Sequence, residues 1–156
     1  MKIVLASDHG GFELKNEIKK ILEELEKTGV PVNEAGEKID KIEDIGAYSE
    51  DSVDYPEYGR KCAEAVVSGQ FDRGIVVCGT GIGISIAANK VHGARCALCT
   101  SVHMAEMTRR HNDANLLALG GRTTEAPLAV EIVKTWLATA FEGGRHQRRV
   151  DLLDQM

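Results

Sequence analysis

The chain has 156 residues, of which 43% are hydrophobic and 28% are charged, and its formal net charge is -5. This composition is typical of one soluble globular domain, and the negative charge argues against general nucleic-acid binding. No apolar run approaches the roughly 20 residues that cross a bilayer, and the first residues indicate a strand rather than a signal peptide. We therefore expect a single domain over residues 1–156, located in the cytoplasm, with no membrane partner.

Short apolar runs alternate along the chain with stretches of helical periodicity. Strands are expected at residues 2–7, 42–45, 74–78, 94–99 and 115–119. Helices are expected at residues 12–28, 54–68, 84–90, 102–110 and 125–141, with a loop over 30–41. In the first helix the predicted inward residues are Phe12, Ile18, Ile21, Leu22 and Leu25. Strands that are apolar on both faces and separated by helices predict an α/β fold, a Rossmann-like αβα sandwich with a five-stranded parallel sheet.

The most informative segment, residues 76–83, joins a β-branched run to a cysteine and three alternating glycines (VVCGTGIG). Glycines before a helix let backbone N–H groups turn toward a bound anion, and the helix N-terminus adds partial positive charge. A thiolate is favoured beside such a nest, so Cys78 is a candidate base or nucleophile. The spacing does not match the GxGxxG dinucleotide fingerprint, and Lys90 lies too far along for a Walker A loop. This segment therefore indicates catalysis rather than nucleotide binding.

The remaining cysteines indicate structure rather than chemistry. Cys62, Cys96 and Cys99 are expected to be free thiols, because nothing in the sequence indicates secretion. Cys96 and Cys99 form a C-x-x-C pair inside an apolar run, where cysteine usually packs as a small hydrophobe. No second ligand pair has a spacing that suits zinc, so we expect no metal site.

Two further polar clusters fall where catalytic side chains are expected. Asp8 and His9 follow the first strand, where a carboxylate can orient an imidazole for proton transfer or phosphate contact; alternatively, Asp8 only caps the next helix. His111 and Asn112 end a helix just before a strand, where His111 could act as a general acid/base and Asn112 could orient a hydroxyl. Alternatively, His111 follows Arg109 and Arg110 only because a helix C-terminus favours cations. Arg122, Arg145, Arg148 and Arg149 form a late basic set suited to phosphate, or a solvated tail.

Taken together, these segments resemble the ribose-5-phosphate isomerase B family, which also includes the galactose-6-phosphate isomerase subunits. The matching segments are SDHGGFELK (7–15), DYPEY (54–58), CGTGIGISIAANK (78–90), HNDAN (111–115) and GGRHQRRV (143–150). They span nearly the whole chain in the family's order, which makes the resemblance far more specific than one glycine loop.

The resemblance implies an aldose–ketose isomerase that needs no metal or cofactor and acts on a phosphorylated sugar. Cys78 would move a proton between C2 and C1, and Thr80 with the loop amides would hold the enediolate oxygen. His111, helped by Asp8, would open the furanose ring. The residues implied to contact the substrate are His9, Tyr55, Gly79, Gly81, Gly83, Asn112, Arg122, Arg145 and Arg149. The family shares each site between two subunits of a homodimer, so we expect the tail from about residue 142 to pack on a partner subunit, in a dimer or a tetramer.

Ribose 5-phosphate, interconverted with ribulose 5-phosphate, is the expected substrate. A six-carbon phosphate such as allose 6-phosphate is the first alternative, and a non-catalytic sugar-phosphate-binding subunit is the second. A mere binder needs no positioned thiol, which weighs against the second alternative. The chain departs from typical members in about ten extra residues before Ile42 and in His103, which stands where an aromatic residue is common.

Overall fold

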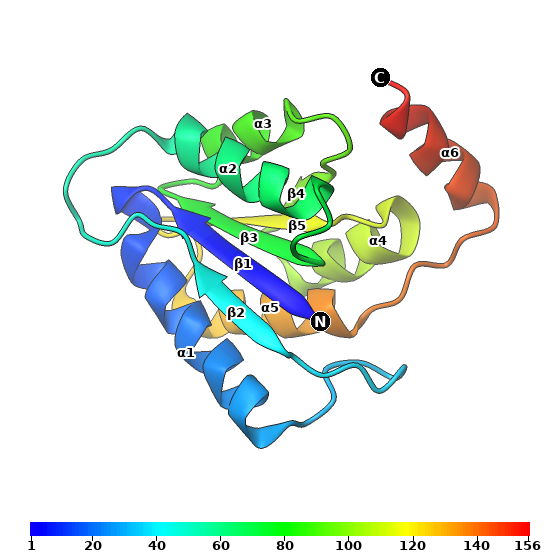
Figure 1. Ribbon diagram of the computed structural model, residues 1–156, viewed down its shortest axis with the longest axis horizontal. Coiled ribbons are helices and arrows are strands. Elements are labelled where there is room, and N and C mark those ends of the chain that lie inside the picture. Colours follow the sequence, from blue (N-terminus) through cyan, green and yellow to red (C-terminus); the bar gives the residue numbers. More distant parts are fainter.

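Five parallel strands form a single sheet in the computed structural model, which describes residues 1–156 (Figure 1). The strands are β1 (Lys2–Ser7), β2 (Lys41–Asp44), β3 (Arg73–Cys78), β4 (Cys96–Leu98) and β5 (Leu116–Gly120). Their spatial order is β2-β1-β3-β5-β4, and every neighbouring pair is parallel. The predicted α/β fold with a five-stranded parallel sheet is confirmed.

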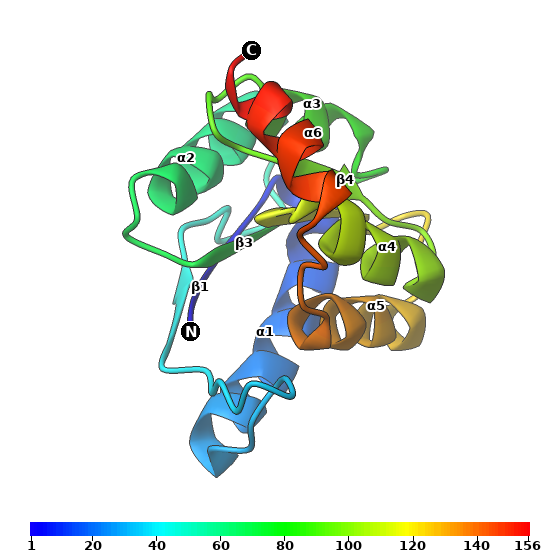
Figure 2. The ribbon, with the colours of Figure 1, turned by 90° about the vertical axis from the view of Figure 1, so that its right-hand side faces the viewer.

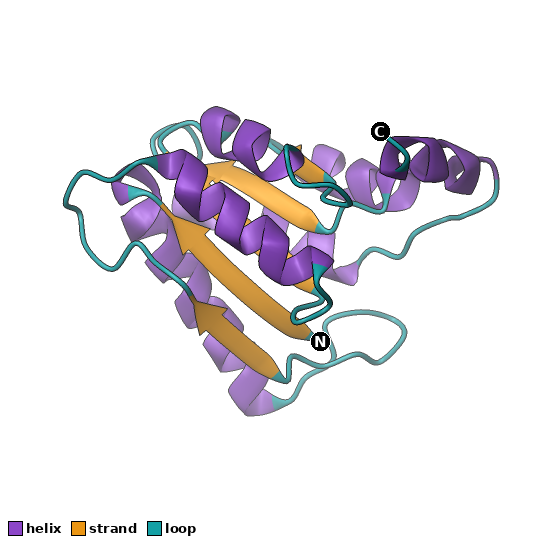
Figure 3. Cartoon of the chain, turned by 45° about the horizontal axis from the view of Figure 1, so that its top comes forward, coloured by secondary structure: helices purple, strands orange, loops and turns teal.

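Helices cover both faces of this sheet, as parallel strands require (Figures 2 and 3). They are η1 (His9–Gly11), α1 (Phe12–Thr28), α2 (Tyr55–Val67), α3 (Ile82–Asn89), α4 (Val102–Asn112), α5 (Ala126–Ala138) and α6 (Arg145–Asp154). One apolar cluster joins α1, α4 and α5 to one face, and a second joins α2 and α3 to the other. None of the helices is both long and apolar enough to cross a bilayer.

Alternation along the strands sends neighbouring side chains to opposite faces. Ile75 and Val77 of β3 belong to the cluster beneath α1 and α5, whereas Val76 and Cys78 belong to the cluster beneath α2 and α3. Cys78 is therefore the last residue of a fully buried strand, with its side chain directed to the α2–α3 face.

Some predicted boundaries were wrong by a few residues. The fourth strand is shorter than expected, and α5 ends at Ala138 rather than at residue 141 because Thr139 adopts extended backbone. The prediction for the inward face of α1 was also partly wrong. Leu14 and Lys15 are buried, whereas Phe12, Ile21 and Leu25 are only half-buried.

The strands all point toward the same end of the molecule. In Figure 1 their arrowheads lie on the left, near the loop between β2 and α2, whereas α6 and the C-terminus lie on the right. Figure 2, viewed from that right-hand side, shows α6 lying across the front of the molecule. The carboxyl edge of the sheet, where open α/β sheets bind ligands, is thus remote from α6 within one chain.

Candidate active site

The cysteine–glycine loop after β3 is built as an anion nest. The backbone N–H of Gly81 donates to Sγ of Cys78 at 3.1 Å, which stabilises negative charge on the sulfur. Gly81 has a φ of 78°, and a Cβ there would meet the Leu119 backbone at 2.8 Å, so no other residue fits. The loop therefore owes its tight turn to glycine.

Three backbone N–H groups around Cys78 have no acceptor in the protein. They belong to Gly79, Thr80 and Gly83, and the last of these lies in the first turn of α3. The unpaired donors and the partial positive charge of the helix end favour a bound oxyanion. The Thr80 hydroxyl accepts from Ile82 N–H at 3.3 Å, which fixes the exposed crest of the loop.

Asp8 and His9 lie at the same edge, at the end of β1. The Asp8 carboxylate accepts from Gly11 N–H at 3.1 Å, so within one chain Asp8 caps the turn, as the alternative interpretation predicted. His9 Nδ1 accepts from Val53 N–H at 3.2 Å. Because Nδ1 is an acceptor, the neutral ring carries its proton on Nε2, which is then free to donate to a ligand.

Arg122 joins this group from the loop after β5. Its backbone N–H donates to Gly79 O at 2.9 Å, and the neighbouring Gly121 N–H donates to Cys78 O at 2.8 Å. The guanidinium lies over two glycines: a Cβ at Gly79 would come within 3.2 Å of Arg122 Nη1, and one at Gly10 within 3.4 Å of Cζ. The structure thus places a cation beside both the β1 turn and the cysteine loop.

Tyr55, the first residue of α2, completes the group. A Cβ added to Gly83 would lie 2.5 Å from Tyr55 Cζ, so the phenol ring rests directly against the backbone of α3. Tyr55 as a whole is 40% exposed, so part of its surface is accessible to a ligand. The predicted residues that come together at the carboxyl edge are Asp8, His9, Tyr55, Cys78, Gly79, Thr80, Gly81, Gly83 and Arg122.

The other thiols differ from Cys78 in their electrostatics. Burial raises the pKa of Cys62 to about 12 and that of Cys99 to about 11, and it also raises the pKa of Cys96. Raised values keep these three thiols protonated and unreactive at neutral pH. All four cysteines are free, as the sequence predicts.

The remaining predicted site residues form a second group at the opposite edge of the sheet. His111 and Asn112 end α4, and Arg145 and Arg149 lie on α6. Between the two edges runs β3, whose six residues span about 16 Å at roughly 3.3 Å per residue. A single chain therefore does not bring His111 to Asp8 or to Cys78.

Within the second group, His111 is packed against residues that the sequence analysis did not single out. Its ring stacks on His146, with centroids 4.3 Å apart and planes inclined by 14°. Glu142 Oε2 lies 3.4 Å from His146 Nε2 and 3.9 Å from His111 Nε2. His146 lies inside the GGRHQRRV segment (143–150) that matches the family, and this was the one sequence feature that could have marked it as a candidate site residue.

Two cavities, of about 520 and 570 Å³, lie near this second group rather than near Cys78. The first is lined in part by Asn112 and the second in part by Glu142.

Comparisons with known proteins agree with this arrangement of motifs. Ribose-5-phosphate isomerase B of Escherichia coli is 45% identical over 152 residues, which covers 97% of this chain and 93% of the relative. Among solved structures, the ribose-5-phosphate isomerase B of Clostridium thermocellum has a TM-score of 0.87 at 52% identity, covering 99% of this chain and 96% of that one. The Mycoplasma genitalium enzyme, solved with bound ribulose-5-phosphate, has a TM-score of 0.85 at 36% identity and covers 99% and 94%.

The family model described as Ribose/Galactose Isomerase matches residues 3–153. That range includes both groups of residues described above, from the turn after β1 to most of α6. The resemblance identified from the motifs is therefore confirmed: the chain belongs to the ribose/galactose isomerase family and is a sugar isomerase.

Proposed function

We propose that this protein interconverts D-ribose 5-phosphate and D-ribulose 5-phosphate, with Cys78 as the base. The observation that carries the proposal is the Gly81 N–H donated to Cys78 Sγ beside unpaired N–H groups of the same loop. Isomerisation needs a base at the reacting carbon and a site for the oxyanion that develops next to it. Both lie within one loop here.

The proton transfer conserves all atoms of the sugar. The Cys78 thiolate takes the proton from C2 of the open aldose, and the electron pair moves to the carbonyl to give an enediolate. The N–H groups of Gly79, Thr80 and Gly83 hold the enediolate oxygen. The proton of the C2 hydroxyl moves to the C1 oxygen while the enediolate is held, so that the carbonyl forms at C2. The Cys78 thiol returns its proton to C1, which gives the ketose and restores the thiolate.

Phosphate binding is the role we assign to the two hydrogen-bond donors that flank this loop, His9 and Arg122. His9 presents Nε2–H, and Arg122 presents its guanidinium, at the same edge as Cys78. Guanidinium groups suit bidentate contact with phosphate oxygens, and a clamp remote from the reacting carbons supplies positioning energy.

Ring opening requires the second half-site to come from a partner subunit. We propose that His111, Asn112, Arg145 and Arg149 of one subunit approach Cys78 and Asp8 of the other in a homodimer. The separation of the two groups at opposite edges of one chain supports this arrangement. The exposed Leu152 and Leu153 of α6, and Met156 just beyond it, offer apolar area for such a contact.

Turnover of ribose 5-phosphate to ribulose 5-phosphate, followed in the presence of a chelator, tests the activity. We expect wild-type turnover and a loss of about 100-fold or more in Cys78→Ala, because general base catalysis contributes about 10²–10⁴-fold. Cys96→Ala is the matched control and is expected to keep its activity. Turnover of six-carbon phosphates alone would replace the substrate, and binding without turnover would leave only a sugar-phosphate-binding protein.

Mixing inactive variants tests the shared site. A dimer of one Cys78→Ala subunit and one His111→Asn subunit contains one intact site and one doubly altered site. Random reassembly of equal amounts should therefore restore about a quarter of wild-type activity in a two-fold symmetric dimer. Activity that stays at the level of the separate variants would place both halves of the site in one subunit.

A further inference from the structure

The proposed function uses His111 but leaves unused the two residues that pack against it, Glu142 and His146. His146 is 7% exposed, although histidine is a polar residue and the only other buried residue of α6 is the apolar Val150. It is stacked on His111 and lies 3.4 Å from the Glu142 carboxylate. The His146 ring is thus buried against the ring to which we assign ring opening, although it has no role of its own in that step.

The backbone holds this cluster together independently of its side chains. Glu142 N–H donates to Arg110 O at 3.1 Å, which ties the segment after α5 to the last turn of α4. His146 N–H donates to Gly143 O at 3.1 Å and closes the first turn of α6. At its far end α6 is held by Asp154, whose carboxylate accepts two hydrogen bonds from Arg95 at 2.6 and 2.8 Å. α6 is thus a docked helix rather than a loose tail.

The charges around the cluster favour an orienting role over metal binding. The ligand atoms of the three residues lie within 4.8 Å of one another, a spacing that also suits a cation. Arg110 pairs with Glu142 at 3.5 Å, and Arg145 and Arg149 add positive charge around His146. Positive charge from three arginines near the cluster, one of which already pairs with its only carboxylate, disfavours a divalent ion.

We propose that Glu142 and His146 are positioning residues that fix the ring of His111 for ring opening. The proposal rests on the function proposed for His111. The stacked ring limits rotation of His111 about its side-chain bonds, and the Glu142 carboxylate, 3.9 Å from Nε2, attracts that side of the ring electrostatically. His111 then presents its remaining face and Nδ1 to the substrate of the partner subunit.

The protonation of His146 agrees with this role. Burial, together with the positive charges of His111, Arg145 and Arg149, lowers the pKa of His146 against the opposing effect of Glu142. A lowered pKa favours the neutral form of the His146 ring that stacks on His111. The charged groups that face the pair are Arg110 on α4, Glu142 in the connecting segment, and Arg145 and Arg149 on α6.

A substrate that cannot form a ring distinguishes two effects of a substitution. A variant that impairs only ring opening loses activity on the cyclic substrate alone, whereas one that damages the whole active site loses activity on both substrates. 4-Deoxyribose 5-phosphate lacks the hydroxyl that closes the furanose, so its isomerisation needs proton transfer only. We expect His146→Ala and Glu142→Gln to lower kcat on ribose 5-phosphate about tenfold or more beyond their loss on the acyclic substrate, since a small misplacement can cost about 100-fold. His146→Phe, which keeps an aromatic ring, should recover part of the loss of His146→Ala.

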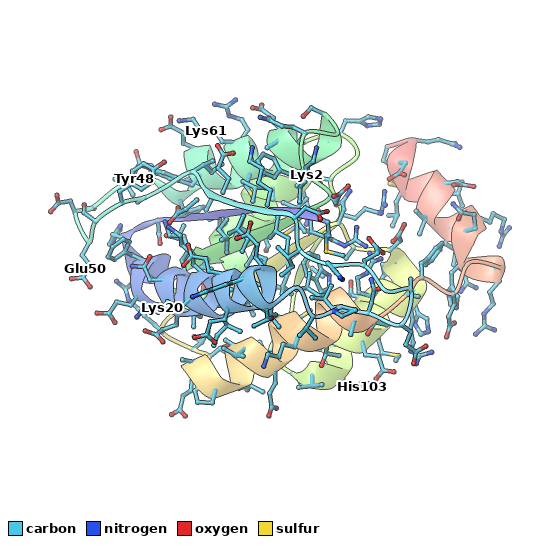
Figure 4. The ribbon with its side chains drawn as sticks, turned by 60° about the horizontal axis from the view of Figure 1, so that its bottom comes forward. Lys2, Lys20, Tyr48, Glu50, Lys61 and His103 are labelled. Atoms are coloured by element: carbon cyan, nitrogen blue, oxygen red, sulfur yellow. The ribbon has the colours of Figure 1, made fainter.

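His103→Asn is the matched control, because His103 is an exposed histidine on α4, the helix that carries His111 (Figure 4). It should leave the ratio of the two turnovers unchanged. Equal losses on both substrates in His146→Ala and Glu142→Gln, or no loss on either, would overturn the proposal.

Imidazole nitrogen signals of His111 in NMR spectra give a readout that does not depend on turnover. They should shift in His146→Ala and Glu142→Gln and stay in place in His103→Asn. Unshifted His111 signals would overturn the positioning proposal. Wild-type protein that turns over neither sugar would instead count against the proposed function, and the spectra would still decide whether these residues fix the ring.

Discussion

Tyr55 rests against Gly83 so closely that a single methyl group at Gly83 would come within 2.5 Å of the phenol carbon Cζ. The contact joins the first turn of α2 to the first turn of α3, the helix that follows the cysteine loop. The position of the aromatic ring at the proposed site is therefore set by the absence of a side chain on the neighbouring helix.

Gly83→Ala should displace Tyr55 and weaken substrate binding. Because the ring is partly exposed it can move outward, so we expect KM to rise by about tenfold with little loss of stability. Steady-state kinetics and thermal unfolding measure the two effects. Ile86→Ala, which alters an exposed residue of the same helix, is the control. An unchanged KM in Gly83→Ala would show that Tyr55 does not contact the substrate.

Selective alkylation should identify Cys78 among the four thiols. Burial raises the pKa of the other three, whereas Cys78 Sγ receives a backbone N–H. A small alkylating reagent at about pH 7.5 should therefore modify Cys78 first, and a bound sugar phosphate should protect it. Peptide mass spectrometry gives the order of labelling. Earlier modification of Cys96 or Cys99 would contradict the electrostatic argument.

Lys15 should be essential for stability despite its charge. Its side chain is fully buried and donates to Asp44 Oδ1 at 2.7 Å and to Ala47 O. Lys15→Met leaves the Asp44 carboxylate buried without this partner. We expect a loss of about 3 kcal/mol in the free energy of unfolding, near the lower end for broken buried pairs, because Lys19 remains 3.7 Å from Asp44.

Denaturant titration of Lys15→Met measures that loss. The control is Lys20→Met on the same helix, where Figure 4 shows the side chain at the surface and the ion pair with Glu17 is exposed. That change should cost less than about 0.5 kcal/mol. Comparable losses in the two variants would mean that the buried pair contributes no more than a surface pair.

Acidification should destabilise the fold through His146. Burial is the first cause that lowers its pKa below the ordinary value of 6.5, so the unfolded state takes up the proton more readily than the folded state. The contribution of neutral His146 to the stability of the fold is therefore fully present above about pH 6.5. It is lost as the pH falls toward the lowered pKa of His146 in the folded state. Denaturant midpoints measured from about pH 7.5 to about pH 5.5 should fall less in His146→Asn than in the wild type.

The sheet and the cysteine half-site follow directly from sequence patterns. The apolar runs predicted at residues 2–7 and 74–78 became β1 and β3, because both are buried on both faces. Since parallel strands end at one edge, the polar residues after β1 and β3 had to come together. The place of Cys78 beside His9 was therefore predictable, although the contact of Arg122 with Gly79 depends on how the loop after β5 folds back.

Other features depend on contacts that no local pattern encodes. The fourth strand starts late because Arg95 N–H is taken by Asn115 Oδ1 at 2.7 Å rather than by a neighbouring strand. Lys15 lies on the inward face of α1. A buried charge at this position is predictable only if the position of its partner, Asp44 on β2, is already known. The His111–His146 stack joins residues 35 positions apart through the path of the segment after α5.

If the site is shared as proposed, the placement of Cys78 and His111 at opposite edges of the sheet limits how two chains can associate. A contact between the Cys78 end of one chain and the His111 end of another joins unlike surfaces. Repeated in one direction, such a contact gives an open filament, whereas a two-fold axis makes it reciprocal and closes the pair. Closure completes both sites in the same step, so complete sites arise in pairs and a diluted, separated subunit contains none.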